Sequence, residues 1–286
     1  KKFKINWSLS PYYRLHLFDP SKPLYHDFGL KLNFSNNPKP GIIFAGTIEE
    51  SLVTNFDDIW RGKKGKLAKV RTDLKNYLNV VDTRIRNLQG SSYYKLSNNM
   101  YGRLSLGYFE PMYSGFSSEF LYAPNGSSIA IGSELNYLNA REFRQLFGSR
   151  NINGMSKLNG HLSSYWDTGY YNYLVQLDVG RYLAGDDGAT LTMTRNFPNG
   201  WEMGGFFTIT NASFEDFGEG SFDKGLFLKI PFASIVPYET RSELVELMRP
   251  IQGDGGARVS MAGRLYPLIS SHNKNQLKSS WGKLWR

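Results

Sequence analysis

The sequence predicts an all-β protein, a transmembrane antiparallel up-and-down β-barrel of about 14–16 strands. Three observations predict it. Apolar and polar residues alternate along most of the chain, short turn signals separate the alternating segments, and aromatic residues gather towards the segment ends. A soluble β-sandwich is the alternative, because alternation by itself is common to both classes.

The composition narrows the class of protein. The chain has 286 residues, a net charge of +9, 6 Trp, 18 Tyr, 19 Phe, four histidines and no cysteine. Without cysteine, disulfides and thiolate chemistry are excluded, and so few histidines do not predict a histidine metal centre. We therefore expect no metal and no cofactor. The basic residues are not clustered in the way that predicts nucleic-acid binding, so we expect no nucleic-acid partner.

The hydropathy of the chain excludes a helical membrane protein but is compatible with a barrel. No apolar run approaches the ~18–20 residues of a membrane-spanning helix, whereas a barrel strand needs about 9–11 residues and only one apolar face. The mean hydropathy of −0.41 fits a chain of which half the strand residues face a polar lumen. The sequence starts at Lys1 without Met or an apolar signal segment, so we expect a processed or truncated piece.

Strands are predicted from period-two alternation, which is clearest near residues 5–17 and in Asp27–Phe34, Gly200–Thr210 and Ala257–Leu265. Weaker alternation is present near residues 41–48, 101–109, 115–123, 128–138, 157–167, 170–182, 188–197 and 224–233. Three segments are ambiguous, near residues 69–80, 86–96 and 239–249, and the last also fits a short helix. Before residue 267 we expect no helix longer than two or three turns.

Turns and longer connections set the order of the strands. Turn signals are found at 98–99, 124–126, 167–169, 186–188 and 198–200. Longer connections are predicted near residues 49–68, 139–156 and 211–223. Our strand count places the first of these on the opposite rim from the other two, whereas long loops of a simple barrel share one side. Either the count is off by one between them, or both rims carry long loops. We expect a barrel domain over residues 1–266, and a last strand or periplasmic tail over 267–286.

The two faces of the predicted strands favour a membrane barrel. Aromatic residues of the apolar face lie towards strand ends, as in interfacial girdles: Trp7, Tyr13, Tyr108, Tyr122, Tyr137, Trp166, Tyr171 and Trp201. The opposite face carries charged residues, which a water-filled lumen solvates and a dry sandwich core does not. We predict that seven of them line the lumen and contact a glycan: Arg103, Glu119, Glu134, Asp178, Glu202, Arg258 and Arg264. The alternative is that they pair with one another and close a narrow lumen.

Two loop clusters are further candidates. The acidic loop contains Glu215, Asp216, Glu219, Asp223 and Lys224 among glycines. Its oxygen ligands suit Ca²⁺ or a hydroxyl-rich glycan, but the spacing is not an EF-hand, and a loop held by glycine turns and one Asp–Lys pair is the alternative.

The basic loop contains Arg61, Lys63, Lys64 and Lys66, followed by Lys69 and Arg71. Its charge suits lipopolysaccharide phosphates or an acidic polysaccharide; the alternative is a solvated loop.

Enzymatic function is not expected. His16 and His161 are the histidines on predicted strands, and Ser8 and Ser163 lie along the same strands without a nucleophile elbow. Paired carboxylates of the acidic loop, such as Glu215 and Glu219, have no feature in the sequence that predicts the raised pKa of a glycosidase acid.

Several segments carry a family resemblance. Tyr101–Gly148 begins YGRLSLGYFEPMYSGF, Val179–Trp201 contains GRYLAGD, and Phe214–Phe232 contains FGEGSFDKG. GDGGARVSMAGRLY (Gly253–Tyr266) and the closing WGKLWR (Trp281–Arg286) follow. The chain resembles the C-terminal portion of the YjbH-like exopolysaccharide-biosynthesis family, which includes the group 4 capsule protein GfcD. The resemblance covers nearly the whole chain.

The resemblance implies an outer-membrane barrel of a Gram-negative bacterium, encoded with lipoprotein and periplasmic partners and preceded by an N-terminal barrel half. It supplies no catalytic residues. We therefore predict a non-enzymatic barrel for exopolysaccharide or capsule secretion or assembly, whose polar lumen and loops guide or gate the glycan. The alternatives are a non-conducting scaffold that recruits lipoprotein and periplasmic partners, and a passive solute porin. Outer-membrane lipids, lipopolysaccharide and polysaccharide are the other expected partners.

Overall fold

The computed structural model describes residues 4–17, 24–55, 66–78, 81–217, 222–231, 243–248 and 253–270. The strands in these ranges are β1 (Ile5–Leu17), β2 (Leu24–Lys39), β3 (Ile42–Thr54), β4 (Thr83–Lys95), β5 (Met100–Tyr108), β6 (Tyr113–Tyr122), β7 (Ile129–Arg141), β8 (Ser149–Arg150), β9 (Leu158–Asp167), β10 (Tyr173–Arg181), β11 (Asp187–Asn196), β12 (Glu202–Thr210), β13 (Asp223–Pro231) and β14 (Glu243–Met248). The helices are α1 (Leu74–Leu78), α2 (Phe214–Phe217) and α3 (Leu265–Ser270). None of the helices in the described ranges is long and apolar enough to cross a membrane.

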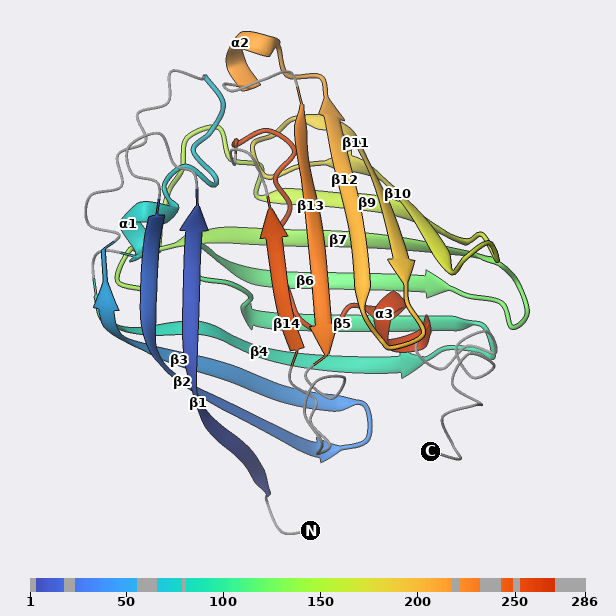
Figure 1. Cartoon of the computed structure of the whole chain (residues 1–286), viewed down its shortest axis with the longest axis horizontal. Coiled ribbons are helices and arrows are strands. Elements are labelled where there is room, and N and C mark those ends of the chain that lie inside the picture. Colours follow the sequence, from blue (N-terminus) through green and yellow to red (C-terminus); the bar gives the residue numbers. More distant parts are fainter. Residues whose placement is uncertain are drawn as a thin grey trace.

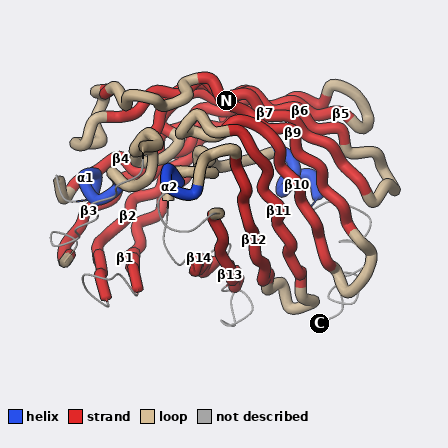
Figure 2. Tube along the Cα trace, turned by 90° about the horizontal axis from the view of Figure 1, so that it is seen from above, coloured by secondary structure: helices blue, strands red, loops and turns tan. Residues whose placement is uncertain are grey.

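The strands form one 14-stranded antiparallel sheet in up-and-down order. Each strand pairs with the next along the chain, except that β7 pairs with β9 and the two-residue β8 pairs with the end of β7. The sheet is strongly curled, and its two terminal strands, β1 and β14, face each other across a gap (Figures 1 and 2). The predicted strand number, all-β class and up-and-down order are confirmed.

The alternation of strand direction defines two rims. Because successive partners are antiparallel, the connections after β3, β7 and β12 leave the sheet on the same side. These are the long connections, so we call this side the long-connection rim. The connections at residues 40–41, 96–99, 123–128, 168–172 and 197–201 are short and lie on the other side, which we call the short-turn rim; the longer connection from β13 to β14 also joins strand ends of this side. The first long connection therefore lies on the same rim as the other two, so the strand count from the sequence is off by one between them.

Residues 69–80 explain that error. If they were a strand, the strand count between the first and second long connections would change by one. The structure instead has a buried loop followed by α1, and Val70 and Tyr77 are fully buried. The other ambiguous segments, residues 86–96 and 239–249, contain β4 and β14.

The two faces of the sheet differ as the alternation predicts. Large apolar side chains point outward and are exposed, among them Trp7 at 71%, Leu106 at 65% and Leu162 at 60%. Their neighbours point into the curve of the sheet and are buried even where they are charged, such as Arg103 at 1% and Asp178 at 2%. The molecule thus has an apolar outside and a polar inside, the reverse of a soluble sandwich.

An apolar cluster closes the interior at the long-connection rim. It combines the loop before α1 with the turns between β5 and β6 and between β10 and β11: Val70, Phe109, Met112 and Leu183 are members. Residues from 257 to 261 complete it. This cluster fills one end of the interior, because side chains from connections that fold inward pack there against Tyr113, Leu138 and Ala140 of the wall.

Candidate functional site

The interior is crossed by a segment that belongs to no strand. Residues 253–266, which we call the interior segment, follow β14, whose end lies at the long-connection rim. The segment starts there, where Asp254 accepts hydrogen bonds from the N–H groups of Arg71 (2.7 Å) and Thr72 (2.9 Å). It ends near the short-turn rim, where the Tyr266 ring stacks on Tyr165 with centroids 3.7 Å apart. The predicted strand at Ala257–Leu265 is wrong.

The interior segment has no ladder partners because other groups take its backbone hydrogen bonds. The Ala262 carbonyl accepts from Gln89 (3.1 Å) and Arg103 (3.2 Å), and the Gly263 carbonyl accepts from the Tyr93 hydroxyl (2.9 Å). The Leu265 N–H donates to the Glu119 carboxylate at 3.0 Å. Inward-facing side chains of the wall therefore hold the segment. Its period-two pattern arises because one of its faces packs into the apolar cluster.

The charged residues of the segment pair with charged residues of the wall. Arg258 lies 2.9 Å from the Asp178 carboxylate and 3.8 Å from that of Glu134, and Arg264 donates to Glu134. On the wall, Arg103 and Glu119 form an ion pair at 3.0 Å. Six of the seven predicted lumen residues therefore meet in one cluster, which we call the clamp: Arg103, Glu119, Glu134, Asp178, Arg258 and Arg264. The two arginines 258 and 264 belong to the segment and not, as predicted, to wall strands.

Glu202, the seventh predicted lumen residue, lies apart from the clamp. It pairs with Lys229 on the neighbouring strand β13 at 3.5 Å, and both side chains keep about a third of their surface exposed. Among the carboxylates of the seven predicted lumen residues, that of Glu202 is thus the most accessible to solvent.

A second charged cluster, which the sequence analysis missed, lies inside β1–β4. Asp27 accepts from Arg14 (2.6 Å), Arg84 (2.5 Å) and the Ser51 hydroxyl (2.6 Å). Glu49 accepts from Arg14 at 2.9 Å. The alternation placed Asp27 on the polar face. Glu49, however, lies in the predicted connection 49–68, and Arg84 lies just before the ambiguous segment 86–96. The sequence therefore did not predict the ion pairs between these residues.

A third group ties the long connections together. Arg71 pairs with Glu110 at 2.8 Å and donates to the carbonyl of Arg258. Arg141 is fully buried and donates to the carbonyls of Ile85, Glu110 and Gln145. The rim is therefore held by arginines that satisfy orphan backbone carbonyls, a role that spacing along the chain does not reveal.

The turn between β10 and β11 also holds the interior segment. Its residue Asp186 is buried and accepts the Gly256 N–H at 2.8 Å. Burial raises the pKa of this carboxyl, while the Gly256 hydrogen bond acts in the opposite direction.

Of the acidic loop candidates, the two carboxylates that the structure describes, Asp216 and Asp223, have separate surroundings. Asp216 accepts from the Ser213 hydroxyl (2.7 Å), which also caps the Asp216 N–H (3.1 Å), so it closes the first turn of α2. Asp223 points inward and is buried, whereas Lys224 is exposed with its Nζ 4.3 Å from the Phe222 ring centroid. Neighbouring positions of a strand face opposite sides, so the expected Asp–Lys pair is wrong. The Glu215 side chain and Glu219 lie outside the described residues.

The basic loop lies largely outside the described residues, which exclude Arg61, Lys63 and Lys64. Lys66 is exposed, with its Nζ 3.9 Å from Asp216, and Lys69 is exposed as well. Arg71 differs, because it is buried against Glu110 and Arg258 as described above. It belongs to the packing of the rim and not to a solvated patch.

The residues considered for catalysis do not form a triad in the described part of the chain. Ser163 donates to Asp178, and neither ring nitrogen of the buried His161 has a hydrogen-bond partner there. The ring of His161 instead packs edge-on against Tyr182, with centroids 4.7 Å apart. The described residues contain no group of three or more His, Asp or Glu side chains placed to hold a metal ion.

The fold and the interior define a class: a curled, up-and-down β protein with an apolar outside and a charged inside that is crossed by its own chain. The family described as exopolysaccharide biosynthesis protein YbjH (YjbH) matches residues 1–271, and the chain belongs to this family. It is 33% identical over 238 residues to the lipoprotein YjbH of Escherichia coli (strain K12). That match covers 82% of this chain and 34% of the relative, so the chain spans about a third of the relative's length. No solved structure matches significantly.

Proposed function

We propose that this chain is a non-enzymatic outer-membrane β-barrel that takes part in exopolysaccharide or capsule secretion and is closed at rest. The observation that carries the proposal is the inverted distribution of side chains. An outward face of exposed Leu, Phe, Tyr and Trp costs free energy in water and is favourable against acyl chains, while the charged inward face is satisfied without lipid contact. Membership of an exopolysaccharide-biosynthesis family supports the secretory role.

The positions of the outward aromatics support a membrane orientation. Trp7, Tyr94, Tyr122 and Trp166 are exposed near the short-turn rim, and Tyr13 and Tyr137 near the long-connection rim. Aromatic girdles mark both interfaces of outer-membrane barrels, whose short turns face the periplasm. The short-turn rim is therefore assigned to the periplasm and the long connections to the cell surface.

The interior segment supports some of the mechanisms that the sequence leaves open more than others. Its clamp and the apolar cluster occupy the interior, which disfavours a passive solute porin. A barrel that guides a glycan through its lumen must first displace this segment. A barrel that remains closed acts as a scaffold for lipoprotein and periplasmic partners. This second candidate is favoured by the clamp, in which each of the six residues has an ion-pair partner.

The secretory role is tested in cells with the full-length protein that contains this chain. Deleting its gene is expected to lower surface polysaccharide, and the wild-type gene is expected to restore it. A charge-reversed clamp (Arg258→Glu with Arg264→Glu) is expected to restore it incompletely if the clamp serves transport. Undiminished polysaccharide in the deletion strain would overturn the proposed function.

A further inference from the structure

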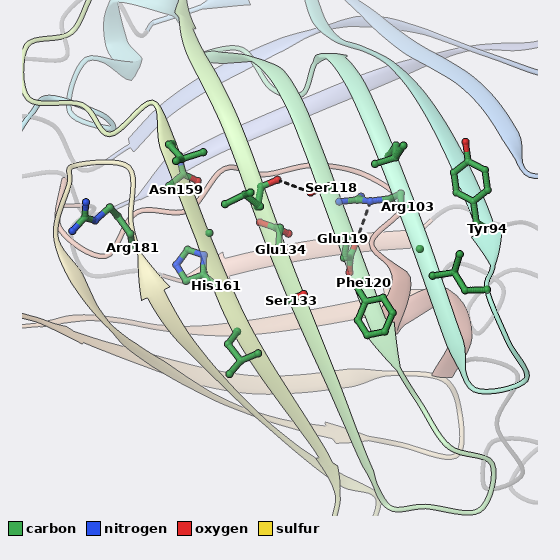
Figure 3. A pocket seen from close by; sticks show the side chains of 17 residues that line it. Tyr94, Arg103, Ser118, Glu119, Phe120, Ser133, Glu134, Asn159, His161 and Arg181 are labelled. Atoms are coloured by element: carbon green, nitrogen blue, oxygen red, sulfur yellow. Dashed lines mark hydrogen bonds and ion pairs between the residues drawn. The ribbon is translucent and has the colours of Figure 1, made fainter.

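A groove of about 780 Å³ crosses the outer face of the sheet over β5, β6, β7 and β9 (Figure 3). Four small outward residues zigzag across its floor, each directly opposite a large residue of the neighbouring strand: Gly102, Ser118, Ser133 and Gly160. Large outward side chains stand beside these small residues: Leu104, Phe120, Leu135 and Leu162. The groove is thus a furrow within the apolar face that the proposed function places in the membrane.

The floor is apolar in spite of its two serines. The Ser118 hydroxyl donates to the Leu135 carbonyl at 3.4 Å, so its oxygen is occupied within the sheet. A Cβ built on Gly102 would be 3.5 Å from the nearest atom of Leu96, an ordinary van der Waals contact, so carbon atoms of Leu96 and Tyr94 border the groove at this glycine. The charged residues of the same strands, such as Arg103, Glu119 and Glu134, point to the interior and pair there. The groove therefore presents almost only carbon to its occupant.

The backbone beneath the groove is already hydrogen-bonded on both sides, because β5, β6, β7 and β9 are all central strands. An extended peptide in the groove could not pair with them, and its own polar groups would remain unsatisfied. An acyl chain has no polar groups along its length, so it leaves no hydrogen bond unsatisfied when it binds there. The groove shape and its position in the middle of the sheet therefore favour a hydrocarbon chain.

The two ends of the groove differ in chemistry. Tyr94 and Leu96 lie at the short-turn rim, whereas Arg181, the last residue of β10, lies at the long-connection rim (Figure 3). Arg181 is half-exposed and uses Nε and Nη2 for a bidentate pair with Asp187, both at 2.8 Å. Among the described residues no hydrogen bond involves its Nη1, which is thus available to an anionic acceptor.

We infer that the groove binds one acyl chain of a phosphate-bearing membrane lipid, with the lipid phosphate at Arg181. This site rests on the proposed membrane function and adds a ligand to it. Guanidinium groups bind phosphate oxygens strongly, and the position of Arg181 at one end of an apolar furrow fits a lipid, which carries its charge at one end. The lipid phosphate then lies at the long-connection rim, and the acyl chain follows the groove from there towards Tyr94.

The test measures how many lipids the full chain retains in native mass spectrometry after release from detergent micelles. The probe is dioleoyl phosphatidylglycerol, with dioleoyl phosphatidylcholine as the zwitterionic comparison. Ser133→Leu fills the groove floor. Ser164→Leu, at an exposed outward position of β9 outside the groove, is the matched control. Arg181→Gln removes the charge at the end of the groove.

The expected result is one retained lipid in the wild type and in Ser164→Leu, and roughly tenfold lower retention in Ser133→Leu. Arg181→Gln should lower retention of phosphatidylglycerol and abolish its preference over phosphatidylcholine. Equal lipid retention in Ser133→Leu and the wild type would overturn the site. A wild type that is dimeric and becomes monomeric in Ser133→Leu would also overturn it, because a second copy of the chain would then occupy the groove. Heat-modifiable migration of the wild type separates the two proposals: a folded barrel that retains no lipid refutes only the groove, whereas a chain that does not fold as a barrel refutes both.

Discussion

The guanidinium of Arg258 lies 2.9 Å from the carboxylate of Asp178, although Arg258 belongs to no strand and Asp178 lies in the wall. This ion pair, together with the Arg264–Glu134 pair, joins the interior segment to the sheet. The charged residues that alternation assigns to a lumen therefore form ion pairs with residues of the same chain. We expect the interior to stay closed as long as these ion pairs are formed.

Reversing the charge of the clamp should open the interior. In the double variant Arg258→Glu/Arg264→Glu, new carboxylates face Asp178 and Glu134, and like charges at this distance repel. We expect the wild type to be electrically silent in planar bilayers and the variant to show discrete conductance steps. Arg195→Glu, at an outward position near the short-turn rim, is the control and should stay silent. A wild type that conducts at rest would contradict the closed interior.

Removing Arg84 should be strongly destabilising. Its guanidinium is 1% exposed and lies between Asp27 and Glu49, which Arg84→Met leaves buried with fewer partners. Breaking a buried pair in this way costs about 3–5 kcal/mol in the free energy of unfolding. Urea unfolding in detergent measures it, and adding Asp27→Asn should recover part of the loss. Arg181→Met, in an exposed pair, should cost about 0–1 kcal/mol; equal losses in both variants would count against a cooperative buried cluster.

Asp254 anchors the first residues of the interior segment to the loop before α1. Its carboxylate accepts from the N–H groups of Arg71 and Thr72 and from the Thr72 hydroxyl (2.9 Å). Asp254→Ala should lower the free energy of unfolding by on the order of 2 kcal/mol, since hydrogen bonds to charged groups are lost. It should also speed amide exchange at Arg71 and Thr72. Asp187→Ala, at an exposed carboxylate, should leave that exchange unchanged, and equal protection in both variants would contradict the assigned role.

Two glycines in the floor of the outer groove should differ in how well they tolerate substitution by alanine. A Cβ on Gly160 would lie 2.3 Å from the Glu134 carbonyl oxygen, which is backbone and cannot move away easily. Gly160→Ala should therefore cost about 1–3 kcal/mol through overpacking, whereas Gly102→Ala should be nearly neutral or stabilising. Thermal unfolding of the two variants in the same detergent checks the difference. The reverse order would be incompatible with this packing of β7 against β9.

The sequence predicted the wall of the fold well because alternation is a local property. Met203, Phe207 and Ile209 share one parity and point outward together, as do Trp7 and Leu9 near the start. Turn residues such as Asn199-Gly200 lie between strands where they were predicted. Each of these features depends on a few neighbouring residues and on no distant partner.

The interior could not be predicted in the same way, because its contacts join residues far apart in the chain. Parity places Asp27 and Arg84 on inward faces, but not beside each other. The period-two pattern at 257–265 is that of a strand, and only its hydrogen bonds to Gln89, Arg103 and Glu119 show that it is not one. The contacts of the basic loop, beyond Lys66, Lys69 and Arg71, lie outside the described residues.

The most direct test of the account uses the absence of cysteine in the chain. Nitroxide labels are placed singly at Leu135 and Leu177, which are 53% and 40% exposed on the outward face, in protein reconstituted into lipid bilayers. Electron paramagnetic resonance then compares collision of each label with oxygen and with a water-soluble nickel chelate. The account predicts that oxygen, which concentrates in acyl chains, dominates at both positions. Dominance of the nickel chelate would place these side chains in water and contradict an apolar face in contact with lipid.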